Sequence, residues 1–391
     1  MLIIKNGKIV TEHMILESRD LLIRDELIVA IVSAGSVEAG ENDEIIDARG
    51  GYVSPGLIDV HSDYIEHMSA PRPSSMMDFS LSLHEFEREL IGHGITTMFH
   101  SLSIYRKALF SEKPIRNAEN VQKFADLIEE SHSRRHLVRH RFHARYELDN
   151  LERTDELMEY ITGKKVHLVS FMDHTPGQGQ YRDLEMYRKT LKGYQTLSEA
   201  ELDDIIKDSQ SAKKLTFETI QKIAKVALEN GIAVASHDDD TTDKISLIKG
   251  LGATISEFPI TMEVAREARA QGLHTIAGAP NILLGGSHAG NLSASEAVRD
   301  GCIDILCSDY YPAAMLHAVF ILHEKYGLGL ADMFSLVTIN PARAVHMDGI
   351  TGSIEAGKRA DVLIVEKIDN GFPVVTTAIV DGKRVFTTSY R

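Results

Sequence analysis

The sequence has little of what marks an exported or membrane-bound protein. It contains no tryptophan and two cysteines, Cys302 and Cys307, which are too few and too close together for a disulfide framework. Free cysteines of this kind are typical of a reducing compartment. No run of about 18 apolar residues could span a membrane, and MLIIKNGKIV at the start is too short and too polar for a signal peptide. We therefore expect a cytoplasmic protein without a membrane partner.

Positive charge is also scarce. Lysine and arginine total 42 against 57 acidic residues, which gives a net charge of -15. A surface of this sign repels nucleic acid and anionic membranes, so we expect neither as a partner. A small anionic substrate would need a site that is locally positive.

Both ends of the chain read as short strands. Residues 1–53 include LIIKNGKIV and DLLIRDELIVAIV and run into EIIDARGGYVSPG, and residues 350–391 include ADVLIVEKIDNGFPVVTTAIVDGKRVF. These runs are alternating or wholly apolar and are broken by Asn-Gly and Asp-Gly turns, a pattern typical of hairpins. At 391 residues the chain is long enough for a large barrel and a second unit. We predict that the two ends pair into one small β-sandwich domain.

Residues 54–349 alternate between strand and helix patterns. Eight apolar strands follow one another: GLIDVH, ITTMFHS, HRFHARYE, VHLVSFMDH, IAVASHDD, ATISEF, HTIAGAP and IDILCSD. The intervening segments LHEFERELIGHG and TFETIQKIAKVALENG are amphipathic, and the apolar stripes that we expect them to bury are Leu83, Phe86 and Leu90 in the first and Phe217, Ile220, Ile223 and Ala227 in the second. Repeated β-α units predict an α/β fold with a closed (β/α)₈ barrel of the TIM type. An open doubly wound sheet is the alternative, but no glycine fingerprint follows the first strand.

One long segment, residues 176–215, does not fit the repeating unit. It is polar and rich in tyrosine and charge. We interpret it as either a helical excursion or a lid over the site.

Polar residues gather where the predicted strands end, which is where a barrel of this type carries its active site. They are His61, Asp63, His143, Arg145, Glu147, His174, His237, Asp238, Glu257 and Asp309. Taken singly, each is as well explained as a helix cap or a rim residue. Six of them together form a set of imidazoles and carboxylates that can hold zinc, manganese or iron: His61, Asp63, Glu147, His174, His237 and Asp309. We predict one or two divalent metal ions, with zinc the first choice.

This distribution resembles the amidohydrolase superfamily, whose barrels hold one or two metals on strand-end histidines and carboxylates. The resemblance implies that Glu147 bridges the metals, because no lysine ends the third strand. The motifs HSDYIEHMSAPRP, HGITT, HARYEL, MDHTPGQ, SHDDDT, GAPNILLGGSHAGN, CSDYYPA and NPARA are similar, in order, to the phosphonate-pathway diphosphatases that act on α-D-ribose 1-methylphosphonate 5-triphosphate. That narrower resemblance implies a metal-dependent diphosphatase that releases pyrophosphate from a small anionic sugar phosphate.

The predicted site suits a phosphate ester. Two divalent ions carry more positive charge than the three predicted carboxylate ligands carry negative charge, and Asp309 is the candidate general base and proton donor. Arg72, on a proline-flanked loop, is the candidate phosphate clamp. The other predicted substrate contacts are Arg145, Asp238, Asn281, Ser287 and His288. The last three lie in a glycine-rich loop that, on its glycine content alone, would be taken for a plain barrel turn.

Two alternatives remain open. A deaminase or cyclic-amide hydrolase could use the same metals on a neutral substrate, without need of Arg72 or the glycine-rich loop. A metal-free scaffold that acts as a binding or assembly protein is the other, although all six ligand positions are filled. A homo-oligomer is equally open.

Overall fold

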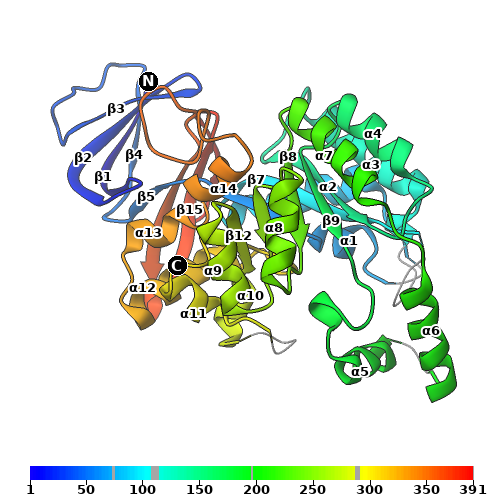
Figure 1. The fold of residues 1–391 in the computed structure, drawn as a ribbon. Coiled ribbons are helices and arrows are strands. Elements are labelled where there is room, and N and C mark those ends of the chain that lie inside the picture. Colours follow the sequence, from blue (N-terminus) through cyan, green and yellow to red (C-terminus); the bar gives the residue numbers. More distant parts are fainter. Residues whose placement is uncertain (73–74, 107–113, 195–196, 287–290, 391) are drawn as a thin grey trace.

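The chain folds into two lobes (Figure 1). The computed structural model describes residues 1–72, 75–106, 114–194, 197–286 and 291–390. One lobe is an eight-stranded parallel barrel, and the other is an eight-stranded mixed sheet that contains both chain termini. The predicted fold class is therefore confirmed.

All eight predicted barrel strands are present. Each pairs in parallel with the strands that precede and follow it in the sequence. They are β6 (Leu57–Ser62), β7 (Ile95–Ile104), β8 (Arg139–Glu147), β9 (Leu168–Met172), β10 (Ala233–His237), β11 (Ile255–Glu257), β12 (His274–Gly278) and β13 (Ile305–Cys307). Strand neighbours along the chain are thus strand neighbours in the sheet, as the repeating unit predicts.

The first and last strands meet at their C-terminal ends. The Asp309 N–H donates to the His61 carbonyl at 3.0 Å, and the Asp63 N–H donates to the Asp309 carbonyl at 2.9 Å. These two backbone hydrogen bonds bring Asp63, which follows β6, beside Asp309, which follows β13.

Nearer the N-terminal ends, the same two strands are joined through an inserted segment. The carbonyls of Leu336 and Val337 accept from the N–H groups of Leu306 in β13 and Ile58 in β6, each at 2.9 Å. The barrel therefore closes directly only on the side where the polar residues lie.

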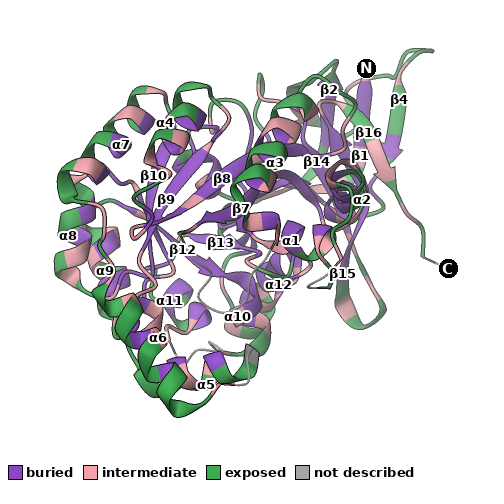
Figure 2. Cartoon of the chain, turned by 90° about the vertical axis from the view of Figure 1, so that its right-hand side faces the viewer, coloured by how far each residue is buried: buried purple, intermediate pink, exposed green. Residues whose placement is uncertain are grey.

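Helices surround the barrel, whose strands separate an inner core from an outer core that packs against the helices. Figure 2 shows buried strands in the middle and helices around them with exposed outer faces. These helices are α1 (Tyr64–Ser69), α2 (Phe79–Gly92), α3 (Ala118–Ser131), α4 (Thr154–Thr162), α7 (Phe217–Glu229), α8 (Thr242–Gly250), α9 (Met262–Ala270), α10 (Ala279–Leu284), α11 (Ala294–Arg299), α12 (Ala314–Tyr326), α13 (Leu330–Ser335) and α14 (Ile339–Ala344). The inner core is formed by small and branched side chains such as Ile58, Val60, Ile255 and Ile305.

Both amphipathic helices expected from the sequence are present, but one residue of the predicted apolar stripes is not buried. Leu83, Phe86 and Leu90 of α2 are buried as predicted. In α7 the predicted stripe is buried except for Phe217, which is 46% exposed. Phe217 is the first residue of α7, directly after the capping residue Thr216, and the buried residues of the helix begin only at Ile220.

The second lobe joins both ends of the chain in one sheet, in the order β16-β15-β14-β5-β1-β2-β3 with β4 beside β1. Its strands are β1 (Leu2–Val10), β2 (Ile15–Arg24), β3 (Leu27–Ser33), β4 (Glu44–Asp47), β5 (Tyr52–Pro55), β14 (Val362–Ile368), β15 (Phe372–Val380) and β16 (Lys383–Thr387). β14 runs antiparallel to β5, so the predicted pairing of the two ends is found. The exact boundaries near residues 53 and 350 stay a prediction.

The long polar segment forms a helical hairpin with a small core of its own. It consists of η2 (Gly179–Tyr181), α5 (Leu184–Tyr194) and α6 (Glu199–Ser211), which extend from the barrel lobe on the side away from the small sheet (Figure 1). Tyr187, Leu191, Leu202 and Ile206 pack together between the two helices. The helical excursion is thus present, and its movement as a lid stays a prediction.

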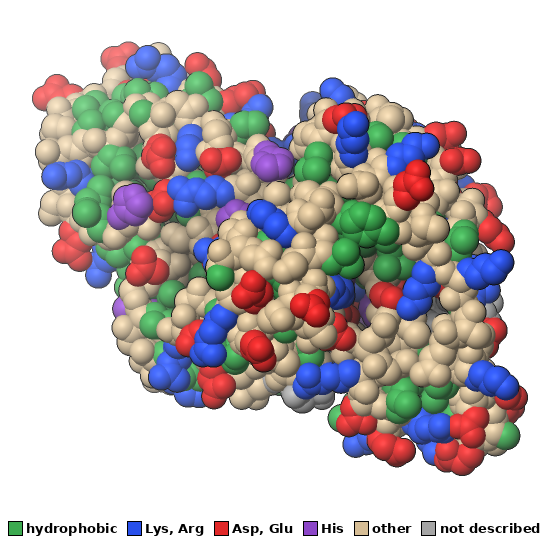
Figure 3. Space-filling model, in the orientation of Figure 1, with side chains coloured by type: hydrophobic (Ala, Val, Ile, Leu, Met, Phe, Trp, Pro, Cys, Tyr) green, Lys and Arg blue, Asp and Glu red, His purple; other side chains and the backbone are tan. Residues whose placement is uncertain are grey.

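The surface carries mixed charge. On the face in Figure 3, basic and acidic side chains are interspersed over both lobes. Within the part of the chain that the structure describes, no helix is long and apolar enough to cross a membrane.

A buried ion pair joins the two lobes. Arg139, at the start of β8, donates through Nη1 to Asp361 at 2.9 Å and through Nη2 to Asp381 at 2.8 Å. Asp361 is buried, and it also accepts from the Thr351 hydroxyl at 2.9 Å. Because these charges are withdrawn from water, each depends on its partner.

Replacing one member of this pair should strongly destabilise the protein. We expect Asp361→Asn to lower the free energy of unfolding by about 3–5 kcal/mol, because it leaves part of the charge of Arg139 buried and unbalanced. Urea denaturation measures the change. Asp300→Asn is the matched control, because Asp300 pairs with the exposed Arg266 and should cost less than about 1 kcal/mol. Equal losses in the two variants would contradict this account.

Candidate metal centre and active-site cavity

A cavity of about 250 Å³ opens at the C-terminal ends of the barrel strands. Seven of the predicted site residues line it: His61, Asp63, Arg145, His237, Asp238, Asn281 and Asp309. They come from β6, β8, β10 and the segments that follow β6, β10, β12 and β13. The C-terminal ends of the barrel strands therefore bring together residues that are up to 248 positions apart in the sequence.

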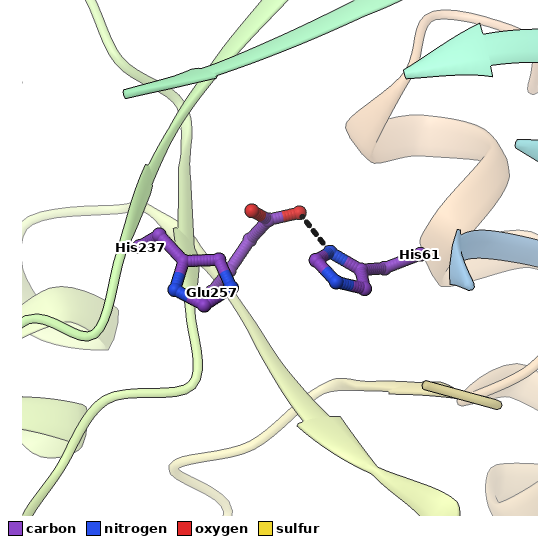
Figure 4. A group of neighbouring side chains, drawn as sticks. All are labelled: His61, His237 and Glu257. Atoms are coloured by element: carbon purple, nitrogen blue, oxygen red, sulfur yellow. Dashed lines mark hydrogen bonds and ion pairs between the residues drawn. The ribbon is translucent and has the colours of Figure 1, made fainter. Parts of the chain in front are cut away.

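His61, His237 and Glu257 form the first group of candidate metal ligands (Figure 4). One nitrogen or oxygen of each lies within 4.8 Å of the others. Glu257 is completely buried and accepts from His61 Nδ1 at 3.1 Å. Burial, with the nearby Arg145 and His237, lowers the pKa of His61 well below its ordinary value. Its imidazole is therefore neutral, which is the form that binds a metal.

His174, His237 and Asp238 form the second group. His237 Nδ1 lies 3.0 Å and His174 Nε2 lies 3.6 Å from Asp238 Oδ2. His174 Nδ1 also contacts the carboxylate of Glu147, which places Glu147 beside this group. His237 belongs to both groups and so stands between them.

The carboxylates of the second group attract positive charge. Burial acts to lower the pKa of His174, but Glu147 and Asp238 outweigh it and raise that pKa to about 9. Burial acts to raise the pKa of Asp238, yet His237 and His174 hold it well below its ordinary value. Together with the neutral imidazole of His61, this donor set fits a divalent ion.

Asp309 and Asp63 face the cavity from the closure of the barrel. The backbone of Asp309 is left-handed, with φ of 58°, and a Cβ on Gly278 would lie in contact with its carboxylate at 3.4 Å. Burial and the carboxylate of Asp63 raise the pKa of Asp309 to about 7, although Arg145 opposes the shift.

Arg145 is the one lysine or arginine among the described residues that line the cavity. Its Nε donates to Met172 Sδ at 3.2 Å, and its Nη2 lies 3.4 Å from His237 Nε2. The guanidinium therefore points toward the candidate metal centre and not toward an acidic partner.

Three predicted substrate contacts are not found in the cavity: one lies elsewhere, and two lie outside the described residues. Arg72 is exposed and is not among the residues that line the cavity. Ser287 and His288 lie outside the described residues. Asn281 lines the cavity, but its amide also holds the following loop, because Nδ2 donates to the Leu292 carbonyl and Oδ1 accepts from the Ala294 N–H, both at 3.0 Å.

The structure also places at the site three residues for which the sequence predicted no role. Glu257 and His143 stood only among the strand-end residues, and both are completely buried. Burial lowers the pKa of His143 to about 3, so this ring is neutral. Arg116 Nε donates to Glu66 at 2.5 Å and its Nη2 lies 3.9 Å from Asp63. Nothing in the sequence around Arg116 signals this contact, because Arg116 belongs to a short turn far from any predicted strand end.

Comparison with known proteins agrees with the sequence motifs. Residues 52–385 match the model of the amidohydrolase family. The chain is 33% identical over 389 residues to the α-D-ribose 1-methylphosphonate 5-triphosphate diphosphatase of Escherichia coli (strain K12), and the match covers 98% of this chain and 100% of that protein.

Solved structures share the fold. The crystal structure of an amidohydrolase aligns over 100% of both chains with a TM-score of 0.67 and 16% identity. Dihydropyrimidinase from Brevibacillus agri NCHU1002 aligns over 98% of this chain and 95% of its own with a TM-score of 0.64 and 14% identity. At these identities the likeness extends to the fold alone.

Because His237 is shared by both donor groups, its loss should affect all bound metal. We expect His237→Asn to lower the metal content more than His174→Asn, which leaves His61, His237 and Glu257 intact. Elemental analysis after dialysis against zinc measures both. His167→Asn is a control, since His167 accepts from the Phe142 N–H outside the cavity. Full metal content in His237→Asn would contradict the assignment.

Proposed function

The chain belongs to the amidohydrolase family, and from this premise we propose that it hydrolyses a phosphoanhydride of α-D-ribose 1-methylphosphonate 5-triphosphate and releases pyrophosphate. The observation that carries the proposal is the end-to-end similarity to the Escherichia coli diphosphatase, at 33% identity over 98% of this chain. Similarity over both lobes means that the barrel, the small sheet and the segments around the cavity are all related. The proposed role is in phosphonate catabolism.

The charge of the cavity supports an anionic substrate. Arg145 lies in the cavity without a carboxylate partner among its hydrogen bonds to described residues, so its N–H groups are available to phosphate oxygens. A guanidinium binds phosphate with charge-assisted hydrogen bonds, which are about twice as strong as neutral ones. Arg145 is the proposed phosphate contact that the geometry supports best.

The metal ligands proposed are His61, His237 and the second-group residues His174 and Asp238, with Glu147, Asp63 and Asp309 beside them. Divalent ions, when bound there, supply Lewis-acid stabilisation of the charge that develops on phosphoryl oxygens. Of the histidines around them, His61 and His143 have lowered pKa values and are neutral.

Asp309 is the proposed general base. Hydrolysis forms one bond from a water oxygen to phosphorus and breaks the bond from that phosphorus to the oxygen of the leaving pyrophosphate. The carboxylate of Asp309, which faces the cavity, takes a proton from the water and returns it to the leaving group. The products are then pyrophosphate and the ribose 1-methylphosphonate 5-phosphate.

One observation favours a second candidate, a deaminase or cyclic-amide hydrolase. The cavity also has an apolar wall, which includes Phe258, Ile260 and Leu292. Such a wall suits the flat face of a neutral ring. The two candidates differ in whether the substrate needs Arg145.

Arg145→Gln should separate the candidates. We expect kcat/KM for the ribosyl triphosphate to fall roughly 10- to 100-fold, because a charge-assisted hydrogen bond contributes about 1.5–3 kcal/mol. Turnover of a neutral cyclic amide, if any, should not change. Steady-state assays of both substrates measure this, and an equal loss for both would contradict the proposed phosphate contact.

Arg72→Ala is the matched comparison. Because the Arg72 side chain is exposed, we expect a smaller loss of kcat/KM than in Arg145→Gln. A loss of the same size would mean that Arg72 also binds the triphosphate, as its proline-flanked position predicts.

Asp309→Asn tests the general base. We expect kcat to fall by roughly 10²–10⁴, because the amide removes the proton acceptor. Metal content measured on the same samples separates the loss of a base from the loss of a ligand. A kcat within a few-fold of the parent protein would remove Asp309 from the proposed mechanism.

A further inference from the structure

A run of buried polar side chains lies beside the candidate metal centre and joins five barrel strands. Its members are His61 of β6, Ser101 of β7, His143 of β8, Ser170 of β9 and Glu257 of β11. None of them is more than 1% exposed. Because they are buried, their polar atoms need hydrogen-bond partners within the protein, apart from the part of His61 that lines the cavity.

The contacts form a continuous path. Ser101 Oγ lies 2.9 Å from His143 Nδ1, and His143 Nε2 contacts Ser170 Oγ. Ser170 Oγ lies 2.6 Å from Glu257 Oε2, and Glu257 Oε1 lies 3.1 Å from His61 Nδ1. The path returns to β6, because the Ser62 N–H donates to Ser101 Oγ at 3.2 Å.

The position of each proton along this path follows from Glu257. The Ser170 hydroxyl donates to Oε2, and where the other oxygen of the carboxyl group also accepts, the His61 Nδ1–H donates to Oε1. The Ser170 hydroxyl proton is then used, and His143 must donate to Ser170 through Nε2–H. This leaves His143 Nδ1 to accept from the Ser101 hydroxyl. Every member has a partner in this one arrangement.

We propose that Glu257 is a positioning residue that, with Ser170, His143 and Ser101, locks His61 as the Nδ1–H tautomer. Nε2 is then the unprotonated nitrogen of His61, which is the nitrogen free to bind a metal. Carboxylates that hold the second nitrogen of a metal-binding histidine fix its ring and raise its basicity. In this arrangement Glu257 acts through His61, and of the first group only His61 and His237 would bind the metal directly.

Aromatic packing supports the same role. The Phe258 ring stands edge-on to His61, with centroids 4.9 Å apart, and 5.1 Å from the ring of His237. Phe258 follows Glu257 directly, so β11 supplies both the carboxylate that orients His61 and the ring that limits its rotation. The inference rests on the metal site of the proposed function and not on the substrate.

The tautomers can be read without metal or substrate. We expect nitrogen-15 NMR of the metal-free, histidine-labelled protein to show His61 protonated on Nδ1 and His143 protonated on Nε2. The variants His61→Gln and His143→Gln assign the signals. A His61 ring protonated on Nε2 in the parent protein would overturn the proposal.

Glu257→Gln gives a sharper test. The glutamine amide has one acceptor oxygen where the carboxylate has two, so it can accept from His61 or from Ser170 but not from both. We expect one of the two imidazoles, His61 or His143, to change tautomer. If neither changes, Glu257 does not set the protons of this path and the proposal fails.

Metal affinity supplies a readout that needs no turnover. We expect Glu257→Ala to weaken zinc binding about 10- to 100-fold in a chelator competition. Glu87→Ala is the matched control, because Glu87 is also buried and next to a histidine, His140, but outside the cavity. Equal affinities in the two variants would overturn the proposal. So would weaker binding without any tautomer change in Glu257→Gln, because Glu257 would then be a ligand. Neither result depends on which substrate the protein hydrolyses.

Discussion

The site depends on how the first and last barrel strands meet. Their direct contact lies at the C-terminal ends, where Asp59 is completely buried and its Oδ1 accepts from the N–H groups of His61 at 3.3 Å and Ser308 at 3.1 Å. Burial raises the pKa of Asp59 to about 7, and a buried carboxyl is tolerated only where hydrogen bonds offset its desolvation. Asp59 therefore ties together the two strands that carry His61 and Asp309.

Charge is distributed so that the cavity differs from the rest of the molecule. The protein as a whole has a net charge of -15, yet Arg145 lies inside the cavity and its neighbouring histidines are placed to hold cations. In the proposed function, acidic groups at the cavity would bind the cations that an anionic substrate requires, and Arg145, the one guanidinium among the described lining residues, would contact the substrate. This arrangement would make the acidic surface compatible with the proposed phosphate ester substrate.

The strand ends could be predicted from sequence, and the network beneath them could not. The alternation of strands and helices placed His61, His237 and Asp309 at one edge, because the carboxyl ends of all parallel strands meet there. The role of Glu257 depends on contacts with Ser170 and His61, which are distant in sequence and leave no local pattern. The prediction of burial also failed at a single position, because Phe217 is the first residue of its helix and is exposed.

The proposed function depends on whether the protein breaks a phosphoanhydride bond or an amide bond. Phosphorus NMR of the metal-loaded protein with the ribosyl triphosphate follows the phosphoanhydride bond directly, and proton NMR of a parallel sample follows the hydrolysis of a cyclic amide. The account predicts that the triphosphate signals give way to pyrophosphate and a single phosphate monoester, while the amide stays intact. An unchanged triphosphate together with hydrolysis of the amide would contradict it.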